Sequence, residues 1–130
     1  LHAKVESALA EARTATASSS QQQHQQHPLL SSLTPPTLRP RIAKLLIKVF
    51  AARDLDRDGL WSVHDLRGFI AHLNGTPPPL PFCYQFCDMF GGRAPRGKLP
   101  VDGLLDFFAQ QSANEPDETI KDLGRLGIHL

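Results

Sequence analysis

The stretch that decides the fold of this chain runs from position 54 to position 65 and reads Asp54-Leu55-Asp56-Arg57-Asp58-Gly59-Leu60-Trp61-Ser62-Val63-His64-Asp65. Carboxylates stand at its first, third and fifth positions, and a glycine stands sixth, where the chain must turn sharply with positive φ. A hard dication such as calcium needs six to eight oxygens at roughly 2.3–2.6 Å, and this spacing wraps that many around one point. The stretch therefore predicts a metal-binding loop.

Six residues of this loop are the predicted metal ligands. They are the carboxylates of Asp54, Asp56, Asp58 and Asp65, the backbone carbonyl of Leu60, and the hydroxyl of Ser62 or a water that it holds. A solvated turn rich in Asp and Gly is the alternative interpretation, and helices on both sides favour the site. Asp65 is shorter than the glutamate usual at position 12, so we expect weaker calcium binding and a narrower difference between calcium and magnesium.

Apolar residues recur at helical spacing on both sides of the loop. Those before it are Ile42, Leu45, Leu46, Val49 and Phe50, and those after it are Leu66, Phe69, Ile70 and Leu73. Two helices around a loop of this composition resemble the EF-hand, the structural unit of the calmodulin-like calcium-binding family. The resemblance covers roughly residues 38–110, and its specificity comes almost wholly from the loop.

A second unit of the same kind follows, without its acids. Leu80 to Phe90 reads as a third helix, and Gly97 and Leu99 fall where the first loop has its glycine and tryptophan. Ligand positions 1, 3, 5 and 12 then fall on Gly92, Ala94, Arg96 and Gly103, none of which is acidic. The entering helix is offset, because no phenylalanine lies four residues before Gly92. The resemblance implies a degenerate hand whose loop pairs with the first through a short antiparallel contact joining Trp61 to Leu99.

Four segments describe the expected organisation: a helix over 1–17, a low-complexity Ser/Gln/His/Pro linker over 18–36, an EF-hand pair over 37–110, and a C-terminal helix and tail over 111–130. The intact hand spans 37–75 and the degenerate hand 76–110. The expected fold class is all-α, with four helices and a two-stranded loop–loop bridge plus flanking N- and C-terminal helices. Because the chain starts at Leu1 rather than Met, we expect it to be part of a longer protein.

Composition narrows the classes of function. Hydrophobic residues make up 41% and charged residues 21%, and the net charge of +1 gives no bulk attraction to nucleic acid. No apolar run is long enough for a membrane span. Cys83 and Cys87 lie four apart on one helical face, which disfavours a disulfide between them. Packing as small hydrophobes is favoured over a redox or metal pair, and a cytoplasmic or other reducing compartment is expected.

We find no catalytic constellation in the sequence, so no enzyme is expected, and His64 and His72 are interpreted as surface or packing residues. The favoured function is a calcium-binding adaptor or regulatory subunit that docks on a helix or a larger protein assembly. The alternatives are a calcium sensor that opens an apolar groove for a target helix, and the regulatory domain of a larger enzyme. Asp65 favours the adaptor, because the longer glutamate is what usually pulls the exiting helix open.

Overall fold

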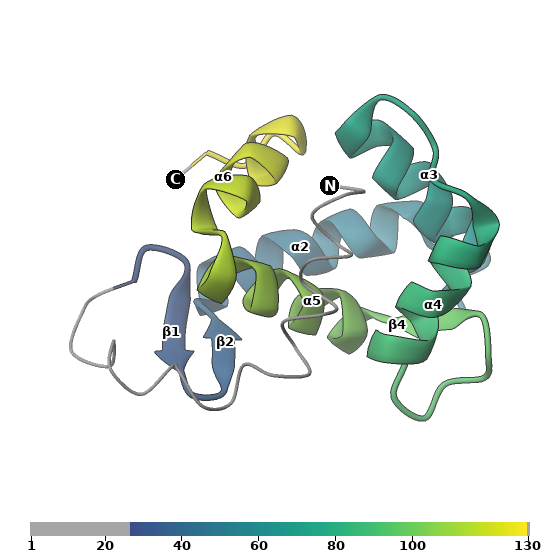
Figure 1. The fold of residues 1–130 in the computed structure, drawn as a ribbon, viewed down its shortest axis with the longest axis horizontal. Coiled ribbons are helices and arrows are strands. Elements are labelled where there is room, and N and C mark those ends of the chain that lie inside the picture. The colour runs from purple at the N-terminus through teal and green to yellow at the C-terminus, as the bar shows by residue number, and fades with distance from the viewer. Residues whose placement is uncertain (1–26, 130) are drawn as a thin grey trace.

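The computed structural model describes residues 27–129, and within them the chain is mostly helical, with two small two-stranded sheets (Figure 1). The helices are α2 (Pro40–Arg53), α3 (Val63–Asn74), α4 (Leu80–Phe90), α5 (Val101–Asn114) and α6 (Pro116–Arg125). The strands are β1 (Leu30–Leu33), β2 (Pro36–Leu38), β3 (Leu60–Ser62) and β4 (Lys98–Pro100). The predicted mostly helical character is confirmed, whereas the predicted helix over 1–17 lies outside the described residues.

Local sequence signals explain where these helices begin and end. Pro40 stands in the first turn of α2, where a backbone N–H would have no intrahelical partner, so proline's lack of an N–H costs no hydrogen bond. Helix α3 begins after Ser62, whose hydroxyl accepts a hydrogen bond from the backbone N–H of Asp65, and it ends at Gly75 with φ of 86°. That left-handed conformation favours glycine. The helix boundaries on either side of the acidic loop are therefore dictated locally.

The two loops meet through a short antiparallel bridge. Strand β3 pairs with β4, with Trp61 opposite Leu99, Leu60 opposite Pro100 and Ser62 opposite Lys98. Trp61 and Leu99 are both fully buried. This confirms the predicted contact between them and places the acidic loop beside its acid-free counterpart.

Aromatic side chains form the centre of the core. Trp61 stacks on Phe50 with ring centroids 4.6 Å apart and donates a hydrogen bond of 3.0 Å from its indole N–H to the Phe50 carbonyl. Phe69 contacts Trp61 at 5.0 Å on one side and Phe108 at 6.2 Å on the other. One continuous aromatic cluster thus links the first helix–loop–helix unit to α5 of the second.

The predicted linker over 18–36 is wrong at its C-terminal end, because β1 and β2 form an antiparallel hairpin there. Leu29, Leu30 and Leu38 are buried, and both strands pack on α5. His27 begins this segment: its Nδ1 accepts hydrogen bonds from the backbone N–H groups of Leu29 and Leu30, and its carbonyl accepts two from the Arg39 guanidinium. Burial lowers the pKa of His27, in keeping with a neutral, accepting ring.

Helix α6 packs on α5 and α3. Ile120 is 43% exposed, whereas Thr119, Asp122 and Leu123 are buried. The inward polar groups bond to α5: the Gln111 amide donates to Thr119 Oγ1 at 3.0 Å and to Asp122 Oδ2 at 3.1 Å. Polar partners on α5 therefore allow Thr119 and Asp122 of α6 to be buried.

Asp122 makes the stability of this packing depend on pH. Burial raises the pKa of its carboxyl, so the folded chain binds this proton more tightly than the unfolded chain does. Stability is then greatest below the ordinary pKa of aspartate and falls as the pH rises through the raised value. We expect Asp122→Asn to remove that fall in urea unfolding followed by Trp61 fluorescence from about pH 4 to about pH 8. Asp117→Asn, an exposed change on the same helix, should keep it; an unaltered pH slope in the Asp122 variant would contradict the assignment.

None of the helices within residues 27–129 combines the length and the hydropathy that crossing a bilayer requires.

Candidate metal centre

The structure brings three of the predicted ligands together at the end of α2. Asp54, Asp56 and Asp58 each offer a carboxylate oxygen, and these atoms all lie within 4.8 Å of one another. Asp54 is buried, with 8% of its surface exposed, whereas Asp56 and Asp58 are open to solvent. Three hard oxygen donors at this separation could hold a metal ion.

Backbone conformation curls the loop around these carboxylates. Arg57 has φ of 56° and Gly59 has φ of 80°, so the chain reverses at the fourth and sixth positions. The turn is held by side chains: Asp54 Oδ2 accepts from the Gly59 N–H at 2.8 Å, and Asp58 Oδ1 accepts from the Leu60 N–H at 2.9 Å. The loop is therefore folded into its ligand-presenting shape by the same aspartates that would bind the ion.

One carboxylate oxygen at this centre has no partner. Asp54 Oδ1 is buried and makes no hydrogen bond, whereas buried polar atoms in proteins are nearly always satisfied. A buried, unpaired anionic oxygen is costly, and a cation bound there would offset that cost. The donor set therefore fits a hard divalent ion.

The pKa values of Asp56 and Asp58 are shifted in this loop, where several carboxylates lie close together. The neighbouring Asp54 carboxylate raises the pKa of Asp56, because it favours the protonated form of the Asp56 acid. The backbone N–H of Leu60 lowers the pKa of Asp58, because it stabilises the carboxylate. The loop thus attracts either a proton or a cation between its first and third positions.

The other three predicted ligands lie beside this group without joining it. Leu60 stands in β3 opposite Pro100, which has no backbone N–H to donate to the Leu60 carbonyl. Ser62 and Asp65 bond to each other's backbone: Asp65 Oδ2 accepts from the Ser62 N–H at 3.0 Å, and Ser62 Oγ accepts from the Asp65 N–H at 3.2 Å. Asp65 is thus engaged in capping α3, and the ligand roles of these three residues remain predictions.

The second loop is closely packed at its last ligand position, whereas the first loop is open to solvent at Asp56 and Asp58. Gly91 and Asp54 occupy equivalent positions, because the N–H of each bonds to the carbonyl four residues earlier, Cys87 and Phe50 respectively. Gly91 nevertheless lies eight residues before Leu99, whereas Asp54 lies seven residues before Trp61. One extra residue explains the offset noted in the sequence. A Cβ on Gly103, at the last ligand position, would collide with the Phe90 carbonyl and lie 2.7 Å from Leu99 Cδ1. The helices approach too closely there for a ligand side chain.

The cysteines and histidines considered in the sequence either pack in the core or lie at the surface. Cys83 and Cys87 are free and buried, and burial raises the pKa of Cys87 to about 11. Such thiols stay protonated, and their packing role is confirmed. His64 is exposed, as is His72, whose ring nitrogen lies 3.2 Å from the Arg125 carbonyl on α6.

Comparison of the chain with protein-family models, with curated proteins and with solved structures gives no match. The residues and their geometry are therefore the basis for any functional proposal.

Proposed function

We propose that this chain is a calcium-binding module of the EF-hand type, with one working site at Asp54–Asp65. We further propose that it serves as an adaptor or regulatory subunit for a protein partner. The single observation that carries the metal site is the buried Asp54 Oδ1, which lacks a hydrogen-bond partner within a group of three carboxylates. Calcium is favoured because every predicted donor is a hard oxygen and the loop offers six of them, and magnesium is the alternative because Asp65 is short.

The adaptor role is supported by what covers the apolar face of the two helix–loop–helix units. Leu123 of α6 is fully buried against the core, and Leu29 and Leu30 at the start of the hairpin are buried as well. The side chain of Arg125 donates to the Leu73 carbonyl, which ties α6 to the end of α3. A sensor exposes an apolar groove when it binds calcium, whereas this face is already filled from within the chain.

Calorimetric titration with calcium, in buffer containing magnesium, tests the metal site and is expected to give one ion per chain. Two equivalent ions would contradict the proposal. Trp61 fluorescence should change on binding, because Trp61 lies within the loop between the predicted ligands Leu60 and Ser62, while the fluorescence of a hydrophobic dye should rise little. A large gain in dye binding with calcium but not with magnesium would establish the sensor instead.

Asp65→Glu tests the position that sets ion choice. The added methylene lets the carboxylate reach the ion with two oxygens, so calcium affinity is expected to rise about tenfold or more, with little change for magnesium. Competition titrations of the two ions measure this ratio. Asp65→Asn, which keeps the length and removes the charge, is the matched variant and should weaken both ions; an unchanged ratio in Asp65→Glu would show that position 12 does not set selectivity.

A further inference from the structure

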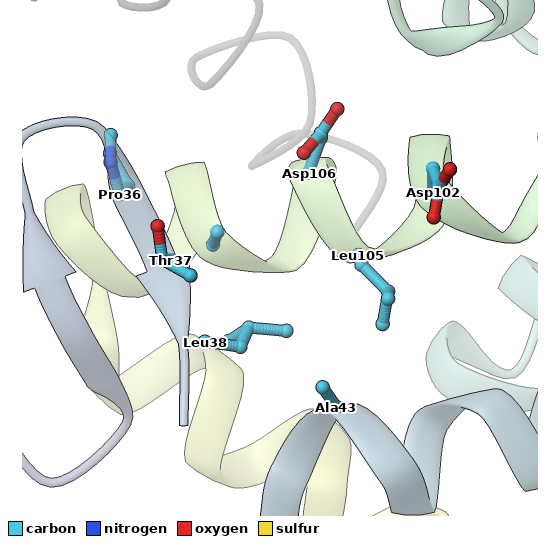
Figure 2. Close-up of a pocket in the computed structure, with 8 residues that line it drawn as sticks. Pro36, Thr37, Leu38, Ala43, Asp102, Leu105 and Asp106 are labelled. Atoms are coloured by element: carbon cyan, nitrogen blue, oxygen red, sulfur yellow. The ribbon is translucent and has the colours of Figure 1, made fainter. Parts of the chain in front are cut away.

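An open hollow with both apolar and acidic lining residues lies on the side of the fold formed by β2, α2 and α5. It encloses about 410 Å³ and lies among Leu38 of β2, Ala43 of α2, and Leu105 and Ala109 of α5 (Figure 2). Short side chains at Ala43 and Ala109 leave the space unfilled, and the side chains of Leu38 and Leu105 border it. The volume is within the range of pockets that receive a bound group.

Two carboxylates stand beside this hollow, one helical turn apart on α5. Asp102 and Asp106 both line it and are exposed. Within residues 27–129 neither of them makes an ion pair with a basic side chain. The dipole of α5 accounts for Asp102, which lies in its first turn, but not for Asp106 one turn later.

Like charges at this spacing destabilise a helix. Partial burial and the nearby Asp102 together raise the pKa of Asp106. A basic group brought by another molecule would offset the repulsion, and an aliphatic group would fill the hollow beside it. Both requirements are met by a helix that carries an aliphatic residue with basic residues a turn away on either side.

We propose that this hollow is a docking site for a basic amphipathic helix of a partner protein, which inserts one aliphatic side chain and pairs Lys or Arg with Asp102 and Asp106. The inference rests on the proposed adaptor role and names the chemistry of its partner. The site lies on α5, β2 and α2 and includes none of the residues proposed to bind the ion.

The test uses a synthetic helical peptide of about 15 residues with a central leucine and lysines one turn before and after it. The same peptide with glutamates in place of the lysines is the matched probe. We expect the lysine peptide to shift the backbone NMR signals of Leu38, Ala43 and Leu105 and to bind more weakly as salt is added, while the glutamate peptide shifts none of them. Equal binding of the two peptides, or shifts confined to other surfaces, would overturn the proposal.

Two protein variants separate this site from general charge effects. Asp102→Asn with Asp106→Asn is expected to weaken the lysine peptide at least about fivefold, because it removes two ion pairs. Asp88→Asn with Asp117→Asn makes the same change in net charge at exposed positions elsewhere and should leave affinity unaltered. Ala43→Leu, which fills the hollow, should also weaken binding; equal weakening by the two double variants would contradict the site.

Calcium titration of the same samples keeps the two proposals apart. Calcium uptake without binding of the lysine peptide overturns the docking site and leaves the metal site standing. Peptide binding at the predicted residues without calcium uptake supports the docking site and contradicts the metal site.

Discussion

Replacing Asp54 with alanine is expected to abolish divalent-ion binding, with a loss of affinity of at least about 100-fold. The variant removes the buried Oδ1, which has no other partner, and the Oδ2 that accepts from the Gly59 N–H at 2.8 Å. Of the three clustered carboxylates only Asp56 and Asp58 remain, and because both are exposed to solvent we expect them to hold an ion only weakly. Calorimetric titration with calcium measures the loss. Asp88→Ala, which deletes an exposed carboxylate on α4, is the matched control and should bind calcium normally.

Asp54→Asn distinguishes loss of charge from loss of loop shape. The asparagine side-chain oxygen can still accept from the Gly59 N–H, so the loop should keep its conformation and the chain its stability. Calcium binding should nevertheless be lost, because a neutral amide oxygen replaces the anchoring carboxylate. If either variant still bound calcium with the affinity of the unaltered chain, the site would have to lie elsewhere.

Trp61→Ala is expected to lower the free energy of unfolding by about 3–5 kcal/mol. Trp61 is fully buried between Phe50 and Phe69, and its indole N–H bonds to the Phe50 carbonyl. Truncation leaves a large cavity at the centre of the core and removes one of the two hydrogen bonds that the Phe50 carbonyl accepts, the other coming from the Asp54 N–H. Urea unfolding followed by circular dichroism measures the change, since the substitution also removes the fluorescent reporter.

The control for this variant is Tyr84→Ala on α4. Tyr84 is 39% exposed, and its ring contacts the Arg96 guanidinium at 5.8 Å, so its loss should reduce stability by no more than about 1 kcal/mol. Trp61→Ala should also weaken calcium binding, because Trp61 stands in the strand between Leu60 and Ser62 and holds the loop to its partner. Equal stability losses for the two variants would show that Trp61 is not central to the core.

Most of the candidate site could be predicted from the sequence because its determinants are local. The spacing of Asp54, Asp56 and Asp58 within one turn of chain brings their oxygens together whatever surrounds them, and Gly59 permits the turn. The limits of α3 follow from Ser62 and Gly75, which act on the backbone next to them. The bridge between Trp61 and Leu99 was also predictable, since the repeat aligns the two loops in sequence.

The position of Asp65 could not be settled in the same way. Its carboxylate has two roles within reach, as a metal ligand and as a cap of α3, and in the structure it caps the Ser62 N–H. Composition likewise gave no indication that the second loop is closed by a tight approach of α5 to the end of α4 at Gly103. That close approach depends on how α4 and α5 pack together, which the residues of the loop do not determine.

The sequence by itself determined the acidic loop and the helices around it, because short-range spacing fixes these features through backbone geometry, while the pairing of the two loops was expected from the repeat and its resemblance to a hand pair. Only the tertiary structure decided that the serine- and proline-rich segment folds into the hairpin of β1 and β2, since its leucines become buried only when α5 lies beside them. The same holds for α6, whose Thr119 and Asp122 turn inward while Ile120 stays exposed. A polar residue can be buried where another element supplies its hydrogen bonds, here Gln111 and Ser112 of α5, and such partners are visible only once the chain has folded.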